Sequence, residues 1–406
     1  MRSVLAHAVL AVGGLVLAWL VWVTPEEETT PGEVELVDCD PDDLRAVVLD
    51  VDRREVKLEL RGEGDERAWW VTVTRRPEVP EGQEQPAAEP TVDEFVAGSV
   101  RLEEYLPKIA PLRALRSLGE LDDETATEVK LGDEAGRFVY TCGERTTEYA
   151  IGATAFGSGD RYLREQDGNT AYLLAADAVR DLQSAEALLM QRELVAFEWP
   201  DVEALVLRAD DREQKLLQRN RREPERAEWV DADEPDRRNE LFGNWLDRFT
   251  QLRVQDYLEP GAEAGSDIEG ESATVVPVLT IEFLEPRDEP AGTVELVRVD
   301  AQPIRYYARS SATRAWVTVP RSIAQQVEDD ARTILGLDPV VRPEPPAPPQ
   351  PTPAATPDAG TAGSEPPTDP HGHAAPPTTP APAPAPQRPA LAPQRPATPA
   401  LPPGHP

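Results

Sequence analysis

Two stretches of the sequence, DLRAVVLDVDRREVKLELRGEGDERAWWVTV at residues 43–73 and DVEALVLRADDREQKLLQRNRREPERAEWV at residues 201–230, align with each other. They share the tripeptide Glu-Arg-Ala, at residues 66–68 and 225–227. In both, apolar residues alternate with polar ones between short polar breaks, which predicts strand, turn, strand, turn, strand. The sequence therefore indicates an internal duplication.

Two later pairs of segments repeat in the same order. Leucines fall at equivalent places of LPKIAPLRALRSL (residues 106–118) and LDRFTQLRVQDYL (residues 246–258), which predicts a helix in each. RYLREQDGNTAYLLAADAV (residues 161–179) then matches RYYARSSATRAWVTVPRSI (residues 305–323). Each member of that last pair is predicted to form a β-hairpin that leads into a helix.

The fold class that this order predicts is α+β. Antiparallel strands joined by short turns, with helices between the runs of strands, favour an antiparallel sheet that carries its helices on one face. We expect two tandem related units of this kind, at residues 35–190 and 191–336.

An apolar segment precedes these units. Residues 4–23, VLAHAVLAVGGLVLAWLVWV, carry no charged side chain, and as a helix they would span about 30 Å, the thickness of the bilayer hydrocarbon core. A cleaved secretory signal is the alternative, but its apolar region usually has about 7–15 residues and ends in small residues. This run is longer and ends with Trp19 and Trp22, which favours an uncleaved transmembrane anchor.

Charges on either side of this segment predict its orientation. Arg2 lies in residues 1–3, whereas the linker at residues 24–34 begins with acidic side chains. By the positive-inside tendency, residues 1–3 are predicted to be cytoplasmic and the body periplasmic or otherwise extracytoplasmic. The predicted location is the cell (inner) membrane, crossed once.

The composition argues against several kinds of function. The chain has 75 acidic and 41 basic residues and a net charge of −34, so we expect nucleic acid and anionic lipid to repel its body. The histidines lie only in the apolar N-terminal run and in the C-terminal tail, at His7, His371, His373 and His405. The body therefore lacks the histidine that a Ser-His-Asp or Cys-His nucleophile or a His-ligated zinc site requires.

Cys39 and Cys142 are the only cysteines. In an oxidising compartment they could form a disulfide, which would close a long loop and contribute about 4 kcal/mol. Two free buried thiols are the alternative, because spacing alone does not establish the geometry of a disulfide.

A proline-rich tail follows the body, at residues 337–406. More than half of the 43 prolines lie beyond residue 340, and that region has no aromatic residue. Such a segment has too little apolar surface to fold, so we predict a disordered, partly polyproline-II spacer. Its repeated APQRPA, at residues 385–390 and 392–397, is either a docking motif for an aromatic groove or low-complexity drift.

No motif in the body predicts a catalytic, cofactor-binding or metal-binding residue, or any cofactor. GATAFGSGD (residues 152–160) has part of the spacing of a phosphate loop but lacks its lysine, so a hairpin turn is predicted there. DCDPDD (residues 38–43) and DADEPD (residues 231–236) begin like calcium loops, and neither completes one.

Carboxylates and tryptophans leave a further alternative open. A pair of carboxylates can hydrolyse glycosides, but no pair stands out among so many. Trp69, Trp70, Trp229 and Trp316 could stack on sugars. Because they recur at the ends of predicted strands, we expect them instead to pack between sheet and helices.

A family resemblance rests on several of these segments, namely WWVTVTRRP (69–77), LGDEAGRFVY (131–140), EYAIGATAFGSGDRYL (148–163), NTAYLL (169–174) and AWVTVP (315–320). With the anchor, they resemble the bacterial domain-of-unknown-function 4340 family (DUF4340). The resemblance implies a single-pass envelope protein, often found beside ABC-type exporters and gliding-motility-like components, with no enzymatic activity attached to it.

The leading hypothesis is therefore a non-enzymatic, membrane-anchored extracytoplasmic accessory or scaffold protein of an ABC-type transport or envelope machine. It would act by protein–protein interaction, with ABC permease subunits as expected partners and no nucleic acid or small-molecule cofactor. The alternative is an envelope hydrolase that uses carboxylates, or a glycan-binding protein.

Overall fold

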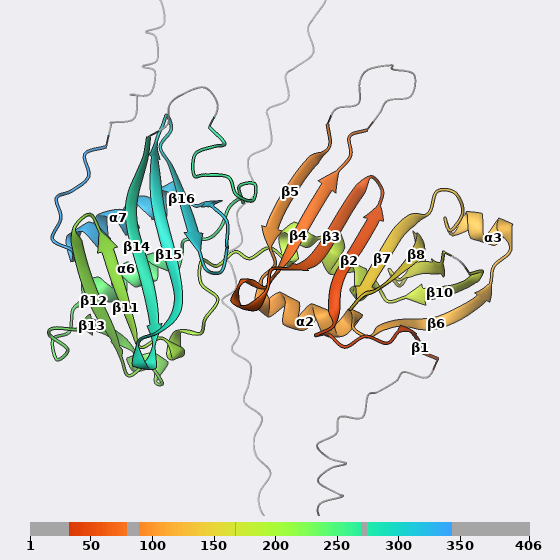
Figure 1. Ribbon diagram of the computed structural model, residues 1–406, viewed down its shortest axis with the longest axis horizontal. Coiled ribbons are helices and arrows are strands. Elements are labelled where there is room, and N and C mark those ends of the chain that lie inside the picture. Colours follow the sequence, from red (N-terminus) through yellow and green to blue (C-terminus); the bar gives the residue numbers. More distant parts are fainter. Residues whose placement is uncertain (1–31, 79–88, 167, 269–273, 343–406) are drawn as a thin grey trace, which may run out of the picture. The chain divides into compact units, whose positions relative to one another are not determined.

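The computed structural model describes residues 32–78, 89–166, 168–268 and 274–342 (Figure 1). The anchor predicted at residues 4–23 and the tail from residue 343 onward lie outside the described residues. Among the residues that are described, no helix is both long enough and apolar enough to cross a membrane.

The first sheet, in the described part of the chain, has ten strands in the order β1-β6-β10-β9-β8-β7-β2-β3-β4-β5, each antiparallel to its neighbours. The strands are β1 Val34–Val37, β2 Leu44–Val51, β3 Arg54–Arg61, β4 Ala68–Arg75, β5 Thr91–Val96, β6 Leu112–Glu120, β7 Gly136–Cys142, β8 Arg145–Thr154, β9 Arg161–Glu165 and β10 Thr170–Leu174.

The second sheet has seven described strands in the order β13-β12-β11-β14-β15-β16-β17, again all antiparallel. They are β11 Ala204–Ala209, β12 Arg212–Arg219, β13 Glu228–Asp231, β14 Thr274–Glu285, β15 Glu289–Asp300, β16 Arg305–Ser310 and β17 Val317–Thr318.

Alternation of buried and more exposed side chains explains why β2–β4 and β11–β13 form strands. Val47 and Leu49 of β2 are buried while the residues between them are not, and Val56 and Leu58 of β3 repeat the pattern. The β2–β3 turn places residues 52 and 53 at φ of 50° and 65°, as a two-residue hairpin requires. The predicted strand-turn-strand-turn-strand pattern is therefore confirmed for β2–β4, and also for β11–β13.

The two sheets share one strand order over seven strands. Reading β4-β3-β2-β7-β8-β9-β10 in the first sheet against β13-β12-β11-β14-β15-β16-β17 in the second matches both position and chain order. A short 3₁₀ turn precedes β4 at Gly64–Glu66 and β13 at Pro224–Arg226. The first sheet adds β5 at one edge and β6 and β1 at the other.

The longer helices pack on one face of each sheet, which confirms the predicted α+β class (Figure 1). The first sheet carries α2 Ser99–Ile109 and α4 Ala176–Gln183, whose buried side chains join those of β2 and β3 in one core. The second carries α6 Glu240–Phe249 and α7 Arg321–Ile334, which share a core with β11 and β14. Two shorter helices are α3 Asp123–Glu128, which packs on the opposite face of the first sheet, and α5 Ala185–Leu188.

The helix predicted over residues 106–118 was wrong beyond Ile109. The helix α2 ends at Ile109, and residues 112–120 form β6, which pairs with both β1 and β10. Leucines three or six residues apart imitate a helical face, but Leu112 and Ala114 are buried on either side of the half-exposed Arg113, which is the period of a strand. Pro111 also lacks the N–H that would continue the helix.

The matching helix predicted over residues 246–258 was wrong in its second half. The helix α6 ends at Phe249, and Leu252, Val254 and Leu258 lie in an extended segment. That segment bonds to other chain segments instead of to itself, since the N–H of Val254 donates to the carbonyl of Arg192 at 2.9 Å. Long-range pairing has therefore overridden the local leucine spacing.

Candidate functional site

The two cysteines are joined in the structure by a disulfide, with Cα atoms 6.0 Å apart. Cys39 lies in the turn before β2, and Cys142 ends β7, the strand that pairs with β2. The residue paired with Cys142 is Leu44. The strands β2 and β7 are far apart in the sequence but adjacent and antiparallel in the sheet, and this pairing brings the two side chains together. The spacing of the cysteines in the sequence could not reveal it.

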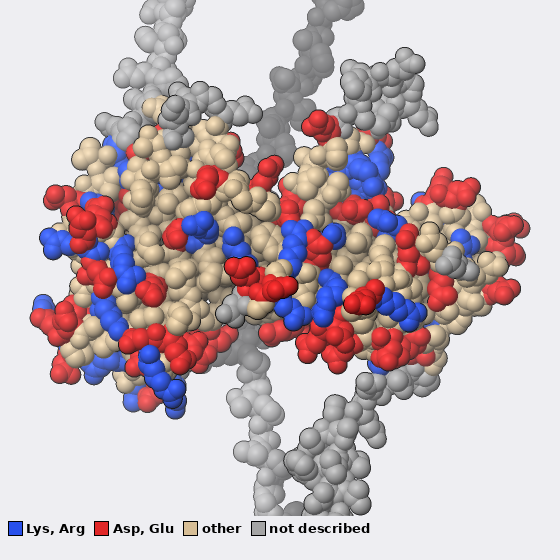
Figure 2. All heavy atoms as spheres, viewed as in Figure 1, with Lys and Arg blue, Asp and Glu red and all other residues tan. Residues whose placement is uncertain are grey.

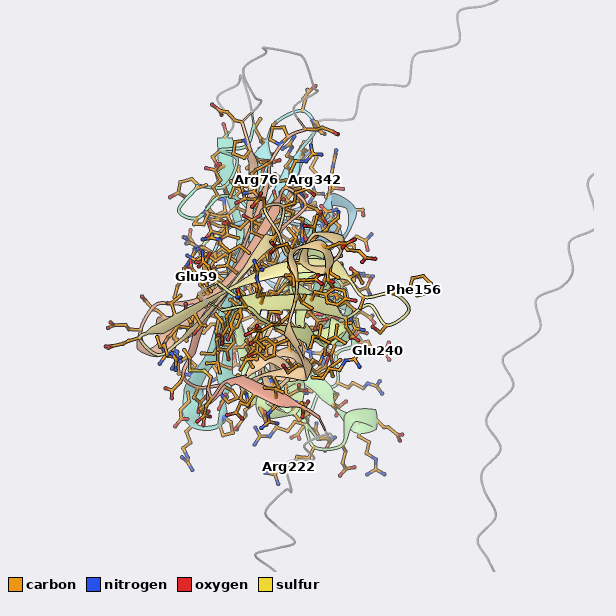
Figure 3. The ribbon with its side chains drawn as sticks, turned by 90° about the vertical axis from the view of Figure 1, so that its right-hand side faces the viewer. Glu59, Arg76, Phe156, Arg222, Glu240 and Arg342 are labelled. Carbon is orange, nitrogen blue, oxygen red and sulfur yellow. A yellow bond between two sulfur atoms is a disulfide. The ribbon has the colours of Figure 1, made fainter. Side chains whose placement is uncertain are left out.

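The segment with partial phosphate-loop spacing is the connection between β8 and β9. The N–H of Ala155 donates to the carbonyl of Asp160 at 2.6 Å, and Gly157 and Gly159 have φ of 85° and 83°, which closes a tight loop. Phe156 is fully exposed at the tip of this loop and points away from the strands (Figure 3). The loop is the predicted turn, but its exposed aromatic residue was not anticipated.

The acidic segments do not assemble a metal site within the described residues. Residues 38–43 form the turn that leads into β2, and residues 231–236 end β13 and turn toward α6. No group of three or more His, Cys, Asp or Glu side chains in the described ranges is arranged to hold a metal ion.

The sequence suggested that all four tryptophans pack between sheet and helices, but the structure shows that not all of them do. Trp229 is buried in the core between the second sheet and its helices, and Trp69 packs against the core of the first sheet. Trp316 is buried too, but in a separate apolar cluster with Val299 and Tyr307, on the face of the second sheet opposite its helices. Trp70 is different, because adjacent residues of a strand point to opposite faces and Trp69 already takes the helix side. The guanidinium of Arg61 lies over the Trp70 ring, 5.5 Å from its centroid, on the face opposite α2 and α4.

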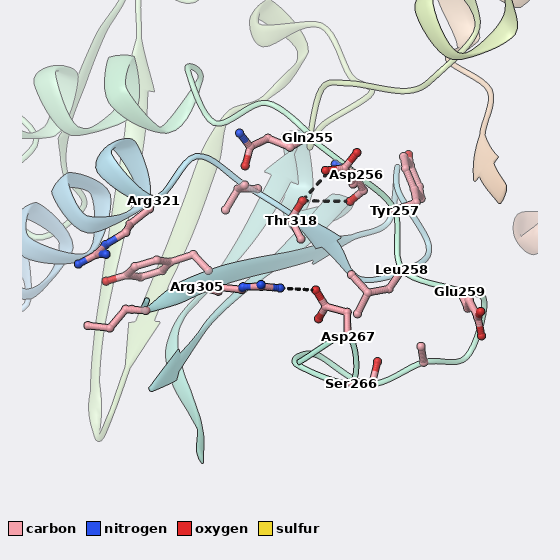
Figure 4. Close-up of a pocket in the computed structure, with 14 residues that line it drawn as sticks. Gln255, Asp256, Tyr257, Leu258, Glu259, Ser266, Asp267, Arg305, Thr318 and Arg321 are labelled. Atoms are coloured by element: carbon pink, nitrogen blue, oxygen red, sulfur yellow. Dashed lines mark hydrogen bonds and ion pairs between the residues drawn. The ribbon is translucent and has the colours of Figure 1, made fainter. Parts of the chain in front are cut away.

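A hollow of about 690 Å³ lies beside the second sheet (Figure 4). Its walls are the segment 255–267, the start of β16, β17 and the start of α7. Figure 4 shows its polar side chains engaged with one another: Nη1 of Arg305 lies 2.7 Å from Oδ2 of Asp267, and the Thr318 hydroxyl accepts from the N–H of Asp256 at 3.1 Å.

The chemistry of this hollow is that of paired polar groups. The hydroxyl of Tyr307 donates to Oδ1 of Asp267 at 2.7 Å, so both oxygens of this carboxylate already accept a hydrogen bond. Burial, followed by that hydrogen bond, raises the pKa of Tyr307 to about 12. Asp267 therefore links the segment 255–267 to β16 through both of its carboxylate oxygens.

A cluster of paired charges around an aromatic ring lies over β3–β5, on the face of the first sheet opposite α2 and α4. We call it the open-face cluster; its members are Lys57, Glu59, Arg61, Trp70 and Glu94. Acidic and basic side chains are interspersed over this part of the surface (Figure 2).

Contacts within the open-face cluster are mutual. Arg61 forms ion pairs with both Glu59 and Glu94, and its Nη2 donates to the hydroxyl of Thr72 at 3.2 Å. Lys57 forms an ion pair with Glu59 as well. Burial opposes ionisation of Glu59, but hydrogen bonds from Lys57 and Arg61 outweigh it and lower the pKa of Glu59. The cluster is thus a surface of charges of both signs that are paired with one another.

The edge strand β5 borders this cluster and has no partner on its outer side among the described strands. The N–H of Ala97 donates back to β4 at 2.9 Å, so the backbone groups of Val92, Glu94 and Val96 point outward. The carbonyl of Val96 accepts from the N–H of Gln191 at 2.8 Å. Val92, which is 53% exposed, and Glu94 therefore present the outward-facing part of the edge.

Comparison of the chain with protein-family models, with curated proteins and with solved structures found no match. The family resemblance therefore stays a prediction.

Proposed function

We propose that the protein is a non-enzymatic, membrane-anchored extracytoplasmic accessory or scaffold protein of an ABC-type transport or envelope machine, and that it acts by binding other proteins. The observation that carries the proposal is the outer edge of β5, which no described strand covers, next to the open-face cluster. An open strand edge can accept a strand from a partner, and adjacent side chains then select which partner is accepted.

The chemistry of that surface favours a protein partner. The cluster offers an aromatic ring and charges of both signs already held in place, so a partner binds without having to order them. Arginine and tryptophan are the side chains most often central to protein interfaces. The charge on Glu94 discourages indiscriminate edge-to-edge pairing, so selectivity is built into the edge itself.

The finer architecture belongs to the same proposal. We propose that the two sheets are tandem related units, supported by the common order of seven strands. The additional strand β5 belongs to the first unit alone, and it creates the edge on which the binding proposal rests. The membrane anchor at residues 4–23 and the spacer role of the proline-rich tail remain proposals drawn from the sequence.

Site-specific photocrosslinking in cells tests the proposal. A photoreactive residue is placed at Val92 on the β5 edge, or at Val100 on α2 as a matched control, because both are exposed valines (53% and 66%). Captured partners are identified by mass spectrometry after solubilisation. ABC permease subunits are expected from position 92 and not from position 100.

Two results would contradict the proposal. Absence of any protein adduct at position 92 would show that the edge is not an interface in the cell. Equal capture of the same proteins at positions 92 and 100 would show that the contact is not specific to this edge.

A further inference from the structure

A second hollow, of about 480 Å³, lies at one end of the first sheet. It is bounded by the β2–β3 turn, the end of β4, the segment after α3, the start of β7 and the end of β8. We call it the cationic pocket; its basic lining residues are Arg53, Arg76, Lys130, Arg137 and Arg161.

The charge of this pocket opposes that of the chain. Five cationic side chains line it against three carboxylates, whereas the chain as a whole has 75 acidic and 41 basic residues. The hollow of Figure 4 has the reverse balance, with two arginines and three carboxylates. Two of the lining arginines pair with carboxylates outside the lining, Arg53 with Glu78 and Arg137 with Glu55, so the cations for which the described structure gives no ionic partner are Lys130 and Arg161.

Several cations of the pocket keep hydrogen-bonding capacity. Arg76 is bound to Asp50, and Arg137 lies 3.6 Å from a carboxylate oxygen of Glu55 outside the pocket. Arg161 donates to a neutral group, the carbonyl of Gly152, at 3.0 Å. The guanidinium of Arg161 has five N–H donors, and the described structure gives no acceptor for the remaining four.

Lys130 differs from the other lysines of the chain. Lys57, Lys108 and Lys215 each form an ion pair, and Lys130 forms none with the residues that the structure describes. It follows α3 with φ of 57°, a left-handed conformation that turns the chain at the rim of the pocket. A lysine without an ionic partner in so acidic a protein is available to an external anion.

Two glycines allow the backbone to form this pocket. A Cβ at Gly152 would lie 2.3 Å from the carbonyl oxygen of Val129, so only glycine lets the residue before Lys130 approach β8. The N–H of Ala153 donates to that same carbonyl at 2.7 Å. A Cβ at Gly136 would lie 2.6 Å from the carbonyl oxygen of Asp50, so glycine at this position similarly lets β7 lie close to β2.

The loop between two lining residues of the pocket carries an exposed aromatic residue. Thr154 and Arg161 both line it, and the loop that joins them carries the fully exposed Phe156 at its tip (Figure 3). Cations around a hollow with an adjacent exposed phenylalanine match the two halves of an anionic lipid, a charged headgroup and the apolar boundary beneath it.

We propose that the cationic pocket binds the oxyanion of a phosphate group, and that Phe156 favours a phosphate carried by a membrane lipid. Lys130, Arg137 and Arg161 would contact the phosphate oxygens, since arginine and lysine are the usual phosphate-binding side chains. The lipid source depends on the proposed membrane anchor, whereas binding of phosphate itself does not.

Protection of Lys130 from an amine-reactive reagent tests this inference on the full chain. In detergent, inorganic phosphate is compared with chloride at equal ionic strength; in nanodiscs, phosphatidylcholine alone is compared with phosphatidylcholine plus phosphatidylglycerol. Mass spectrometry gives the labelling rate of Lys130 relative to that of Lys215, the internal control. We expect phosphate and phosphatidylglycerol each to slow labelling of Lys130 at least threefold and to leave Lys215 unchanged.

Two variants sharpen the result. Arg137→Gln should raise the phosphate concentration for half-protection at least fivefold, and Arg309→Gln in the second sheet should not. Phe156→Ser should abolish protection by phosphatidylglycerol and keep protection by phosphate. No protection by either anion, or protection indifferent to Arg137→Gln, overturns the pocket; protection by phosphate alone overturns the lipid source. The test is independent of the β5 edge, so it can fail while the proposed function stands.

Discussion

Nη1 of Arg298 donates to Oε1 of Glu328 across 2.5 Å, and these two side chains are only 10% and 3% exposed. The pair joins β15 to α7 in the second sheet. Two further donors reach the same carboxylate, the hydroxyl of Tyr306 at 2.6 Å and Nη2 of Arg342 at 2.5 Å. Burial, followed by the hydrogen bond to Glu328, raises the pKa of Tyr306. Three donors around one buried carboxylate fix the helix, the sheet and the last described residue to one another.

Glu328→Ala is expected to lower the free energy of unfolding by about 3–5 kcal/mol, because it removes the buried partner of Arg298 and leaves only the exposed Asp300 to pair with it. The measurement is urea unfolding followed by tryptophan fluorescence. Glu295→Ala is the matched control, since its ion pair with Arg309 is exposed and should contribute about 1 kcal/mol or less. Equal losses for the two variants would show that burial does not set the strength of this contact.

We expect removal of the hydroxyl to have different effects on stability at two buried tyrosines of the first sheet. Tyr140 donates to the carbonyl of Ile109 at 2.9 Å, so Tyr140→Phe should destabilise the protein by about 1–2 kcal/mol. The hydroxyl of Tyr149 is buried with no partner in the described structure, so Tyr149→Phe should be neutral or stabilising. Thermal unfolding of the two variants in parallel decides the matter; a larger loss for Tyr149→Phe would be inconsistent with this packing.

Alkaline pH should destabilise the fold because buried tyrosines resist the ionisation that tyrosines undergo in the unfolded chain. Burial, and secondarily the Glu165 carboxylate, raises the pKa of Tyr149 to about 12, and the pKa of Tyr307 is also raised to about 12. An unfolded tyrosine titrates near 10, so between about pH 10 and 12 the unfolded chain releases protons that the folded chain retains. The stabilisation is complete below pH 10 and is lost as pH rises to 12.

Urea midpoints measured from pH 9 to 12 check this dependence. Tyr149→Phe should make the decline with pH shallower, because it removes one of the titrating groups. Tyr162→Phe is the control, since this tyrosine is only half-buried. A slope that Tyr149→Phe leaves unchanged would exclude Tyr149 as a contributor.

Removing the disulfide should destabilise the first sheet selectively. Cys39 and Cys142 are 103 residues apart, and opening a loop of that length costs about 2–5 kcal/mol by chain entropy. Cys39→Ser together with Cys142→Ser, or treatment with a reductant, should speed amide hydrogen exchange in β2 and β7. Exchange in β11 and β14 is the internal control and should change little. Uniform acceleration in both sheets would indicate that the two sheets unfold as one unit.

The strands β2–β4 and β11–β13 could be predicted because the pattern that specifies them lies within a short stretch of sequence. Val56 and Leu58 alternate with charged residues, and polar residues fill the turns, so β2–β4 and β11–β13 follow from period and turn chemistry. Residues 112–120 could not be predicted in the same way. Their leucine spacing fits a helix, and only pairing with β1 and β10 on both sides makes the strand the better state.

The candidate sites were still less visible in the sequence. Lys130, Arg137 and Arg161 lie on three separate segments, and nothing in their spacing indicates a common pocket. Trp69 and Trp70 are adjacent and identical in type, so the sequence could not say which one faces the helices. The exposed Phe156 was hidden inside a correctly predicted turn.

The sequence by itself determined the acidic composition, a body without histidine, and the repeated strand pattern, because composition and short-range periodicity are properties of the chain alone. Only the tertiary structure decided which residues meet: Arg298 with Glu328, Cys39 with Cys142, and the cations of one pocket. Such contacts depend on strand order and register, which are fixed when distant segments bury apolar surface together, and a one-residue shift in register would reverse every face.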